Sequence, residues 1–170
     1  FLVDTFFSLL FFVFLLRLLL QWARADFRNP LSQAIVRLSN WLIMPLRRLL
    51  PPVGRVDTAS VVAVLLVALA KVAALLLVAG AGLPDALTWV RFAALDILRT
   101  ILWVYFWAIF VYALLSMVAP GNYSPASSIL EALCEPILGR IRRVVPAIGG
   151  LDLSPLWAGI AIQVALILLR

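Results

Sequence analysis

The sequence predicts an all-α integral membrane protein with four transmembrane helices in two parallel tandem repeats, each with a cytoplasmic interfacial amphipathic helix. Composition, four apolar stretches and an internal repeat support this fold class. Of the 170 residues, 65% are hydrophobic and 13% are charged, and the mean hydropathy is +1.13. Average soluble domains are about 45–50% apolar. A chain this short cannot bury so much apolar surface in water, which excludes a soluble enzyme.

Four apolar stretches approach or reach the roughly 20 residues that a transmembrane helix needs. They cover residues 5–22, 59–79, 100–119 and 155–169. Arg17 interrupts the first stretch and Lys71 the second, and a cation inside a span costs about 2.5–3.5 kcal/mol on insertion scales. We expect Arg17 to snorkel to the cytoplasmic face and Lys71 to reach outward. A role for these intramembrane charges in an ion path is the alternative.

The distribution of arginines predicts the orientation in the membrane. The connection between the third and fourth spans and that between the first and second contain nine arginines: Arg24, Arg28, Arg37, Arg47, Arg48, Arg55, Arg140, Arg142 and Arg143. The connection on the other side contains two, Arg91 and Arg99. The positive-inside rule therefore places these two connections in the cytoplasm and both termini on the opposite side of the membrane. The net charge of +6 then suits anionic lipid headgroups, not nucleic acid.

An internal repeat appears when the chain is shifted by 95 residues. Residues 47–57 and 142–152 share the pattern R-R-x-x-P-x-x-G-x-Φ-D, in which Φ is apolar. Each unit consists of a span, a cytoplasmic segment and a span, so both units insert the same way up and are related by an axis along the membrane normal. We therefore divide the chain into a first repeat (1–79), an outer-face connection (80–99) and a second repeat (100–170).

The cytoplasmic segments are predicted to be short helices in the headgroup plane. Asn29 and Ser124 are each followed by proline, which is typical of an N-cap and the first helical position. Apolar residues then recur every three to four positions, as expected of an amphipathic helix of roughly 15 residues. Pro45 and Pro136 should kink or interrupt these helices. A similar stripe on the outer face predicts a helix running into the third span, through Leu87, Val90, Ala94 and Ile97.

The repeated arginine doublets are the candidate lipid- or partner-binding residues: Arg47, Arg48, Arg142 and Arg143. A guanidinium group binds phosphate oxygens through two parallel hydrogen bonds and stays charged in partly apolar surroundings. Ordinary anchoring to anionic lipid explains the doublets. A specific phospholipid or partner-docking site is the sharper interpretation, and pairing with nearby aspartates is compatible with either.

The carboxylates near the span ends allow two interpretations. Asp57 and Asp152 end the repeated motif just before the second and fourth spans, where a carboxylate can cap a helix and complement its dipole. A proton or cation relay is the alternative for this pair. Asp4 and Arg99 carry opposite charges at equivalent repeat positions, and we hypothesise that they pair near the outer face.

The sequence lacks the residues of common catalytic and metal sites. It contains no histidine and a single cysteine, Cys134, which excludes His-dependent nucleophiles and intramolecular disulfides. It also contains no phosphate-cradling glycine loop, catalytic carboxylate pair or metal-ligand cluster. We therefore expect neither an enzyme nor a cofactor or bound metal.

Several segments resemble a known family. Residues 17–22, 28–33, 45–51 and 56–60 resemble the first repeat of the YggT family of bacterial inner-membrane proteins, and residues 135–146 and 149–155 resemble the second. Tyr112 stands where the second repeat would carry a counterpart of Arg17. The resemblance implies that the protein lies in the bacterial inner membrane, where the predicted orientation puts both termini in the periplasm. The roles suggested for this family are in osmotic tolerance and cation homeostasis. The resemblance also implies relatives in plastids tied to membrane-complex and cofactor assembly or nucleoid organisation, and it transfers no catalytic residue.

Two functions follow as expectations. The first is a non-enzymatic interaction or assembly protein that binds anionic headgroups and a membrane-protein partner or a second copy, with a link to envelope or osmotic homeostasis. The alternative is an oligomeric channel or transporter subunit for cations. Polar residues in or near the spans motivate that alternative: Arg17, Lys71, Gln163, Asp57 and Asp152.

Overall fold

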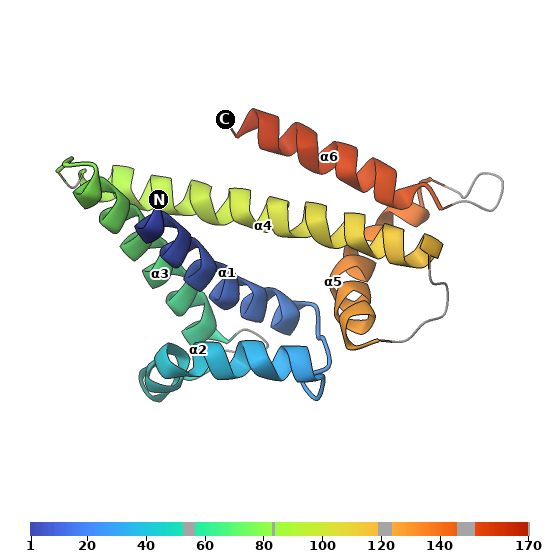
Figure 1. The fold of residues 1–170 in the computed structure, drawn as a ribbon, viewed down its shortest axis with the longest axis horizontal. Coiled ribbons are helices and arrows are strands. Elements are labelled where there is room, and N and C mark those ends of the chain that lie inside the picture. The colour runs from blue at the N-terminus through green and yellow to red at the C-terminus, as the bar shows by residue number, and fades with distance from the viewer. Residues whose placement is uncertain (53–56, 83, 119–123, 146–151, 170) are drawn as a thin grey trace.

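The computed structural model describes residues 1–52, 57–82, 84–118, 124–145 and 152–169. Within these ranges all regular secondary structure is helical, which confirms the all-α class (Figure 1). The helices are α1 (Leu2–Trp22), α2 (Pro30–Leu49), α3 (Thr58–Val78), α4 (Ala86–Val118), α5 (Pro125–Arg142) and α6 (Ser154–Leu168).

Three of the helices are long and apolar enough to cross a membrane, namely α1, α3 and α4. The helix α6 is apolar but has 15 residues. The 33 residues of α4 extend for about 50 Å, well beyond the roughly 30 Å of a bilayer's hydrocarbon core. This single helix contains both the predicted outer-face helix and the predicted third span, so the stripe from Leu87 does run into that span.

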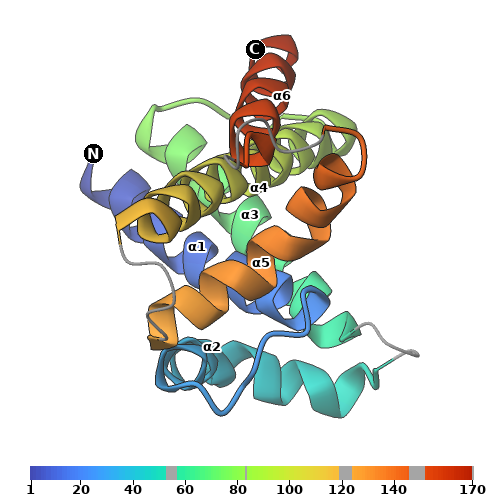
Figure 2. The same ribbon diagram turned by 90° about the vertical axis from the view of Figure 1, so that its right-hand side faces the viewer.

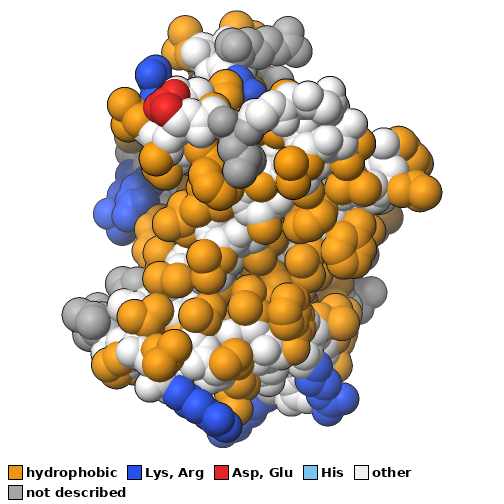
Figure 3. Space-filling view, turned by 90° about the vertical axis from the view of Figure 1, so that its left-hand side faces the viewer, with side chains coloured by type: hydrophobic (Ala, Val, Ile, Leu, Met, Phe, Trp, Pro, Cys, Tyr) orange, Lys and Arg blue, Asp and Glu red, His pale blue; other side chains and the backbone are white. Residues whose placement is uncertain are grey.

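Apolar side chains cover much of the molecular surface. Phe12, Trp107 and Ile160 lie on three different helices and are each more than two-fifths exposed. Figure 3 shows a broad belt of hydrophobic side chains across the middle of one face, with Lys and Arg side chains along the lower edge where α2 lies. A soluble monomer rarely exposes a contiguous apolar surface of this extent. The belt therefore identifies a membrane protein.

The two halves of the chain use the same helix contacts. In the first half α1, α2 and α3 all pack against one another, and in the second half α4, α5 and α6 do the same. The core between α1 and α3 combines large residues such as Phe11 and Phe14 with small ones such as Ala59 and Ala63. Small residues let two helix backbones approach closely, which is how helices associate in lipid.

Both predicted N-caps of the interfacial helices are confirmed. The Asn29 Oδ1 atom accepts a hydrogen bond of 2.9 Å from the backbone N–H of Leu31 at the start of α2. The Ser124 Oγ atom accepts one of 3.1 Å from the backbone N–H of Ser127 at the start of α5. The helices have 20 and 18 residues, somewhat more than the expected length.

Neither internal proline ends its helix, since α2 continues past Pro45 and α5 past Pro136. The expected kink is present in α2. In Figure 1 the first part of α2 is seen from the side and its last part end-on. In Figure 2 the first part is seen end-on and the last part from the side, so the two parts run in different directions. Proline cannot donate to the carbonyl four residues earlier and its ring crowds that carbonyl, which explains the bend.

Candidate functional site

The repeated motif forms the same ion pair in both halves. In the first half, Arg47 Nη2 lies 2.5 Å and Nε 3.2 Å from Asp57 Oδ2. In the second half, Arg142 Nε lies 2.8 Å from Asp152 Oδ2. Each pair connects the end of an interfacial helix to the start of the next apolar helix. We call these two pairs the motif clasps.

The two clasps differ in burial. The Asp57 side chain is 2% exposed and that of Asp152 is 40% exposed. Asp57 Oδ2 also accepts a 2.7 Å hydrogen bond from Ser60. Burial alone would raise the pKa of Asp57, but hydrogen bonds from Arg47 and Ser60 hold the pKa below its ordinary value. The first clasp therefore joins a buried carboxylate to an arginine whose side chain is 43% exposed.

The second clasp lies at the surface and includes a further acid. Arg142 Nη1 lies 2.9 Å from Glu135 Oε2, which is in the same helix. Although burial alone would lower the pKa of Arg142, hydrogen bonding to Asp152 raises it overall. For Asp152, hydrogen bonds from Ser154 and Arg142 outweigh burial and lower the pKa. Both members of this pair are therefore charged near neutral pH.

Only one motif aspartate makes a capping contact through its side chain. Asp152 Oδ1 accepts a 2.9 Å hydrogen bond from the backbone N–H of Ser154, the first residue of α6. Asp57 precedes α3, and its backbone carbonyl accepts a hydrogen bond from the N–H of Val61. Its side chain makes no capping hydrogen bond with α3, because the carboxylate is directed to Arg47 and Ser60.

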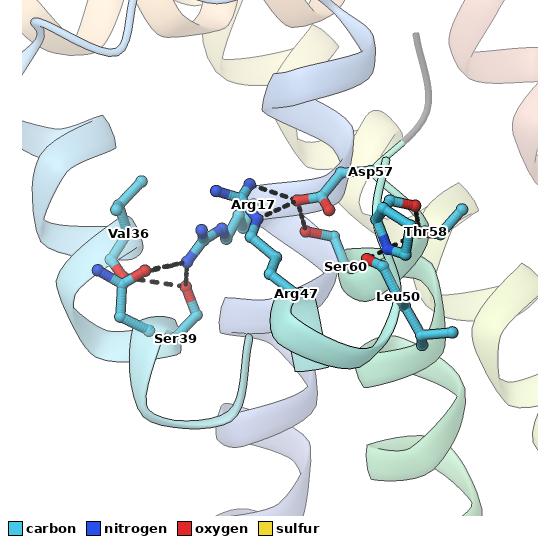
Figure 4. A network of polar contacts seen from close by, with 10 residues as sticks. Arg17, Val36, Ser39, Arg47, Leu50, Asp57, Thr58 and Ser60 are labelled. Carbon is cyan, nitrogen blue, oxygen red and sulfur yellow. Dashed lines mark hydrogen bonds and ion pairs between the residues drawn. The ribbon is translucent and has the colours of Figure 1, made fainter. Parts of the chain in front are cut away.

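The buried guanidinium group of Arg17 binds α2. Its Nη1 donates to Ser39 Oγ at 2.7 Å, to Asn40 Oδ1 at 2.8 Å and to the backbone carbonyl of Val36 at 3.2 Å (Figure 4). Arg17 is 4% exposed. Three acceptors on α2 bind the side chain within the protein, and the expectation that it reaches toward the cytoplasmic face stays a prediction. This contact holds the bent helix α2 against α1.

A cavity of about 470 Å³ lies beside this contact. Its lining includes three arginines and two glutamines, and it is formed by Arg17, Gln21, Phe27, Gln33, Val36, Arg37 and Arg47. The structure thus brings Arg17 and Arg47 together at one site. The second arginines of the doublets, Arg48 and Arg143, are exposed.

Lys71 forms an ion pair that the sequence reasoning missed. Its Nζ atom lies 2.9 Å from Asp96 Oδ2 and 3.2 Å from Oδ1, which connects α3 to α4. The same atom lies 5.8 Å from the centroid of the Phe11 ring, within the range of a cation–π contact. Asp96 is an acidic residue in a mostly apolar helix, and this was the signal available in the sequence.

The hypothesised Asp4–Arg99 pair is wrong. Arg99 Nε donates a 3.1 Å hydrogen bond to the backbone carbonyl of Leu169 at the end of α6. Asp4 instead accepts a 3.3 Å hydrogen bond from Ser8 one turn further along α1. Repeat symmetry predicted equivalent positions, but it did not predict that α6 would end beside Arg99.

A further contact connects the two halves. Asn29 Nδ2 donates to the backbone carbonyl of Pro125 at 2.6 Å and to Ser128 Oγ at 2.9 Å. One side chain therefore caps α2 and binds the start of α5. Sequence reasoning identified the cap but not this bridge, although an amide carries its acceptor and its donors on two separate atoms, whereas the serine at the equivalent position has both on one oxygen.

The described residues offer no metal cluster of three or more His, Cys, Asp or Glu side chains. Cys134 is buried, and this burial raises the pKa of its thiol to about 12. Such a thiol is inert as a nucleophile at neutral pH.

The long apolar helices and the exposed apolar belt together define a multi-helix membrane protein. The CCB3/YggT family model matches residues 1–78 and 92–170. The chain belongs to this family. A protein of Escherichia coli K12 named as uncharacterised protein YggT is 39% identical over 156 residues, which are 92% of this chain and 80% of that protein.

Two further relatives have similar coverage. An uncharacterised protein of Pseudomonas aeruginosa is 39% identical over 167 residues, or 96% of this chain and 83% of the relative. An uncharacterised protein of Vibrio alginolyticus, named for its place in the proC 3′ region, is 40% identical over 166 residues, or 97% of this chain and 89% of the relative. No solved structure matches the chain significantly.

Proposed function

We propose that this chain is a non-enzymatic interaction protein of the bacterial inner membrane. In this proposal α2 and α5 lie in the cytoplasmic headgroup layer, bind anionic lipid and dock a membrane-protein partner or a second copy. The repeated clasp is the observation that carries the proposal. It fixes the first arginine of each doublet and leaves Arg48 and Arg143 exposed at equivalent positions.

The surface of α2 supports this placement. Leu38 and Trp41 are both 61% exposed and Met44 is 52% exposed, and exposed arginines at positions 37 and 48 lie on the same helix. A helix that combines exposed apolar and cationic side chains fits the boundary between headgroups and acyl chains. Arginine in this layer gains from the negative potential of the inner leaflet.

A cation channel or transporter subunit is the second candidate. The Lys71–Asp96 pair favours it, since ionisable groups between apolar helices often mark ion paths. However, Lys71 and Arg17 are both bound by groups of the same chain. A conduction path within one copy would require these contacts to open, so the internal pairing favours docking over transport.

Cysteine labelling tests the shared orientation of the doublets. In a Cys134→Ala background, Arg48→Cys and Arg143→Cys should both react with a membrane-impermeant maleimide from the cytoplasmic side of inverted vesicles. Arg91→Cys, placed in the predicted outer connection, is the control and should react from the periplasmic side. Labelling of positions 48 and 143 from opposite sides would overturn the proposal.

Crosslinking in native membranes followed by mild-detergent purification tests the docking role. A stoichiometric foreign membrane protein, or a second copy crosslinked through α2 or α5, supports docking. The exposed-arginine variant Arg48→Gln/Arg143→Gln should reduce that crosslink, whereas Arg91→Gln should not. Potassium flux through proteoliposomes that is abolished by Lys71→Met would instead support the transport alternative.

A further inference from the structure

The cavity between α1 and α2 carries a concentrated positive charge. Arg17, Arg37 and Arg47 all contribute to its lining, and Asp57 is the acid bound to Arg47. Among the residues that the structure describes, no carboxylate forms an ion pair with Arg17 or Arg37. Three guanidinium groups therefore share one bound carboxylate, and the cavity has an excess of positive charge.

Arg17 is already desolvated and oriented at this site. Its Nη1 atom makes the three hydrogen bonds to α2, which fixes the plane of the guanidinium group. A guanidinium group has five N–H donors on three nitrogens, so the other two nitrogens retain donors for a ligand. Because α2 supplies neutral acceptors, these contacts do not neutralise the charge of Arg17, and Asp57, the carboxylate that acts on it electrostatically, is already bound to Arg47. Pre-ordering of this kind reduces the entropy lost when a ligand binds.

The glutamines of the cavity add polar groups that suit an oxyanion. Within the described part of the chain, the buried Gln21 Oε1 atom has no hydrogen-bond partner. Its amide lines the cavity, and a half-turn of the amide exchanges this oxygen for an N–H2 donor. Gln33 contributes a second amide to the lining. Amide donors and arginines together are typical ligands of phosphate oxygens.

We infer that the cavity binds a phosphate group, with Arg17 and Arg37 as its principal donors and Arg47 held at its edge by Asp57. The inference deepens the proposed lipid-binding role, on which it rests for the placement of α2 at the headgroup layer. A phospholipid headgroup and a free phosphate offer the same chemistry here. Phe27 and Val36 line the cavity as well, so a ligand with an apolar part gains additional contact.

The site belongs to the first half of the chain. The residues 95 positions beyond its three arginines are Tyr112, Ala132 and Arg142, so two of the three cations are replaced. The residue equivalent to Val36 is Glu131, which would repel an anion. The repeat therefore carries two clasps but a single phosphate site, and binding should saturate at one phosphate per chain.

Native mass spectrometry of the full chain in maltoside detergent tests the inference. Wild-type protein should retain one phosphatidylglycerol in preference to phosphatidylcholine. The variant Arg37→Gln should weaken this binding about tenfold, because losing one charge-assisted hydrogen bond reduces affinity by about that factor. Arg91→Gln removes an exposed arginine that lies outside the cavity and outside α2 and α5, so it is the control and should change binding less than about twofold.

Two additional measurements decide the source of the phosphate and the role of Arg17. Inorganic phosphate is titrated while the melting temperature is recorded; a stabilisation abolished by Arg37→Gln, without phosphatidylglycerol preference, supports a free-phosphate site. Arg17→Lys keeps the charge but lacks the planar fork, and it should weaken binding as Arg37→Gln does. If this variant fails to fold, Arg37→Gln decides the question.

The outcomes separate the cavity from the general lipid role. Equal weakening by Arg37→Gln and the control Arg91→Gln would overturn the phosphate site and leave the proposed docking through α2 and α5 intact. Wild-type protein that binds neither phosphatidylglycerol nor inorganic phosphate would also overturn the site. The labelling of positions 48 and 143 judges the proposed function independently of either result.

Discussion

Lys71 and Asp96 form an ion pair between α3 and α4, with Nζ 2.9 Å from Oδ2. The lysine side chain is 12% exposed and the aspartate side chain 30% exposed. The ammonium group of Lys71 also lies over the ring of Phe11, 5.8 Å from its centroid. Because α3 belongs to the first half and most of α4 to the second, this pair is one of the polar contacts that connect the halves.

Removing one member of this pair should destabilise the protein more than removing both. Lys71→Met leaves Asp96 without its cation, and Asp96→Asn leaves Lys71 without its anion, so each should cost about 2–3 kcal/mol. The double variant should recover at least half of that loss. Unfolding of the purified protein by graded SDS measures these differences. Additive losses would contradict the prediction, and the exposed Asp4→Asn serves as the control.

The two clasps should contribute unequally to stability. Asp57→Asn removes a buried carboxylate from its half-exposed arginine and weakens the contact with Ser60, so we expect a loss of about 2 kcal/mol. Asp152→Asn breaks a surface pair, for which a loss below about 1 kcal/mol is expected. The two variants change the same residue type at equivalent repeat positions, so each is the control for the other. Equal losses would show that the burial of the aspartate does not determine how much each clasp contributes to the free energy of unfolding.

Acid should weaken both clasps over a defined pH range. The pKa of Asp57 and that of Asp152 are both lowered in the folded protein, so their contribution is fully present above the ordinary aspartate pKa of about 3.9. It is lost as the pH falls below that value and through the lowered folded-state pKa. Melting temperatures measured between about pH 7 and pH 3 should decline more for the wild type than for Asp57→Asn/Asp152→Asn.

The sequence contained enough information for the helices and caps but not for the polar contacts between helices. Hydrophobic periodicity and the Asn-Pro and Ser-Pro pairs depend on neighbouring residues, so the starts of α2 and α5 could be predicted. The partners of Arg17 and Lys71 depend on which helix faces lie together. A single sequence with a strong repeat favours symmetric pairing, and this is why Asp4 and Arg99 were wrongly paired.

The burial of the clasps and the lining of the cavity also depend on tertiary packing, so the sequence alone did not predict them. The spacing of Arg47 and Asp57 made a pairing conceivable, but burial distinguishes their clasp from that of Arg142 and Asp152, and burial follows from tertiary packing. Arg37 and Arg47 lie on opposite sides of Pro45 in α2, and both line a cavity with Arg17. Pro45 predicted a bend in α2, but a bend alone does not specify which side chains come to lie together.

Asn29 offers a test of how the two halves are held together, because it performs two separable tasks. Its Oδ1 atom caps α2, and its Nδ2 atom donates to Pro125 and Ser128 at the start of α5. Asn29→Ser should keep the cap, as Ser124 does for α5, and lose the bridge. Asn29→Ala should lose both, at a further cost of about 1 kcal/mol.

Disulfide crosslinking between cysteines introduced at Leu31 and Ala126 reports the distance between the helix starts. Its yield should fall equally in both variants, whereas resistance to SDS unfolding should fall further in Asn29→Ala. An unchanged crosslink yield in Asn29→Ser would contradict the bridging role and leave Asn29 as a simple helix cap.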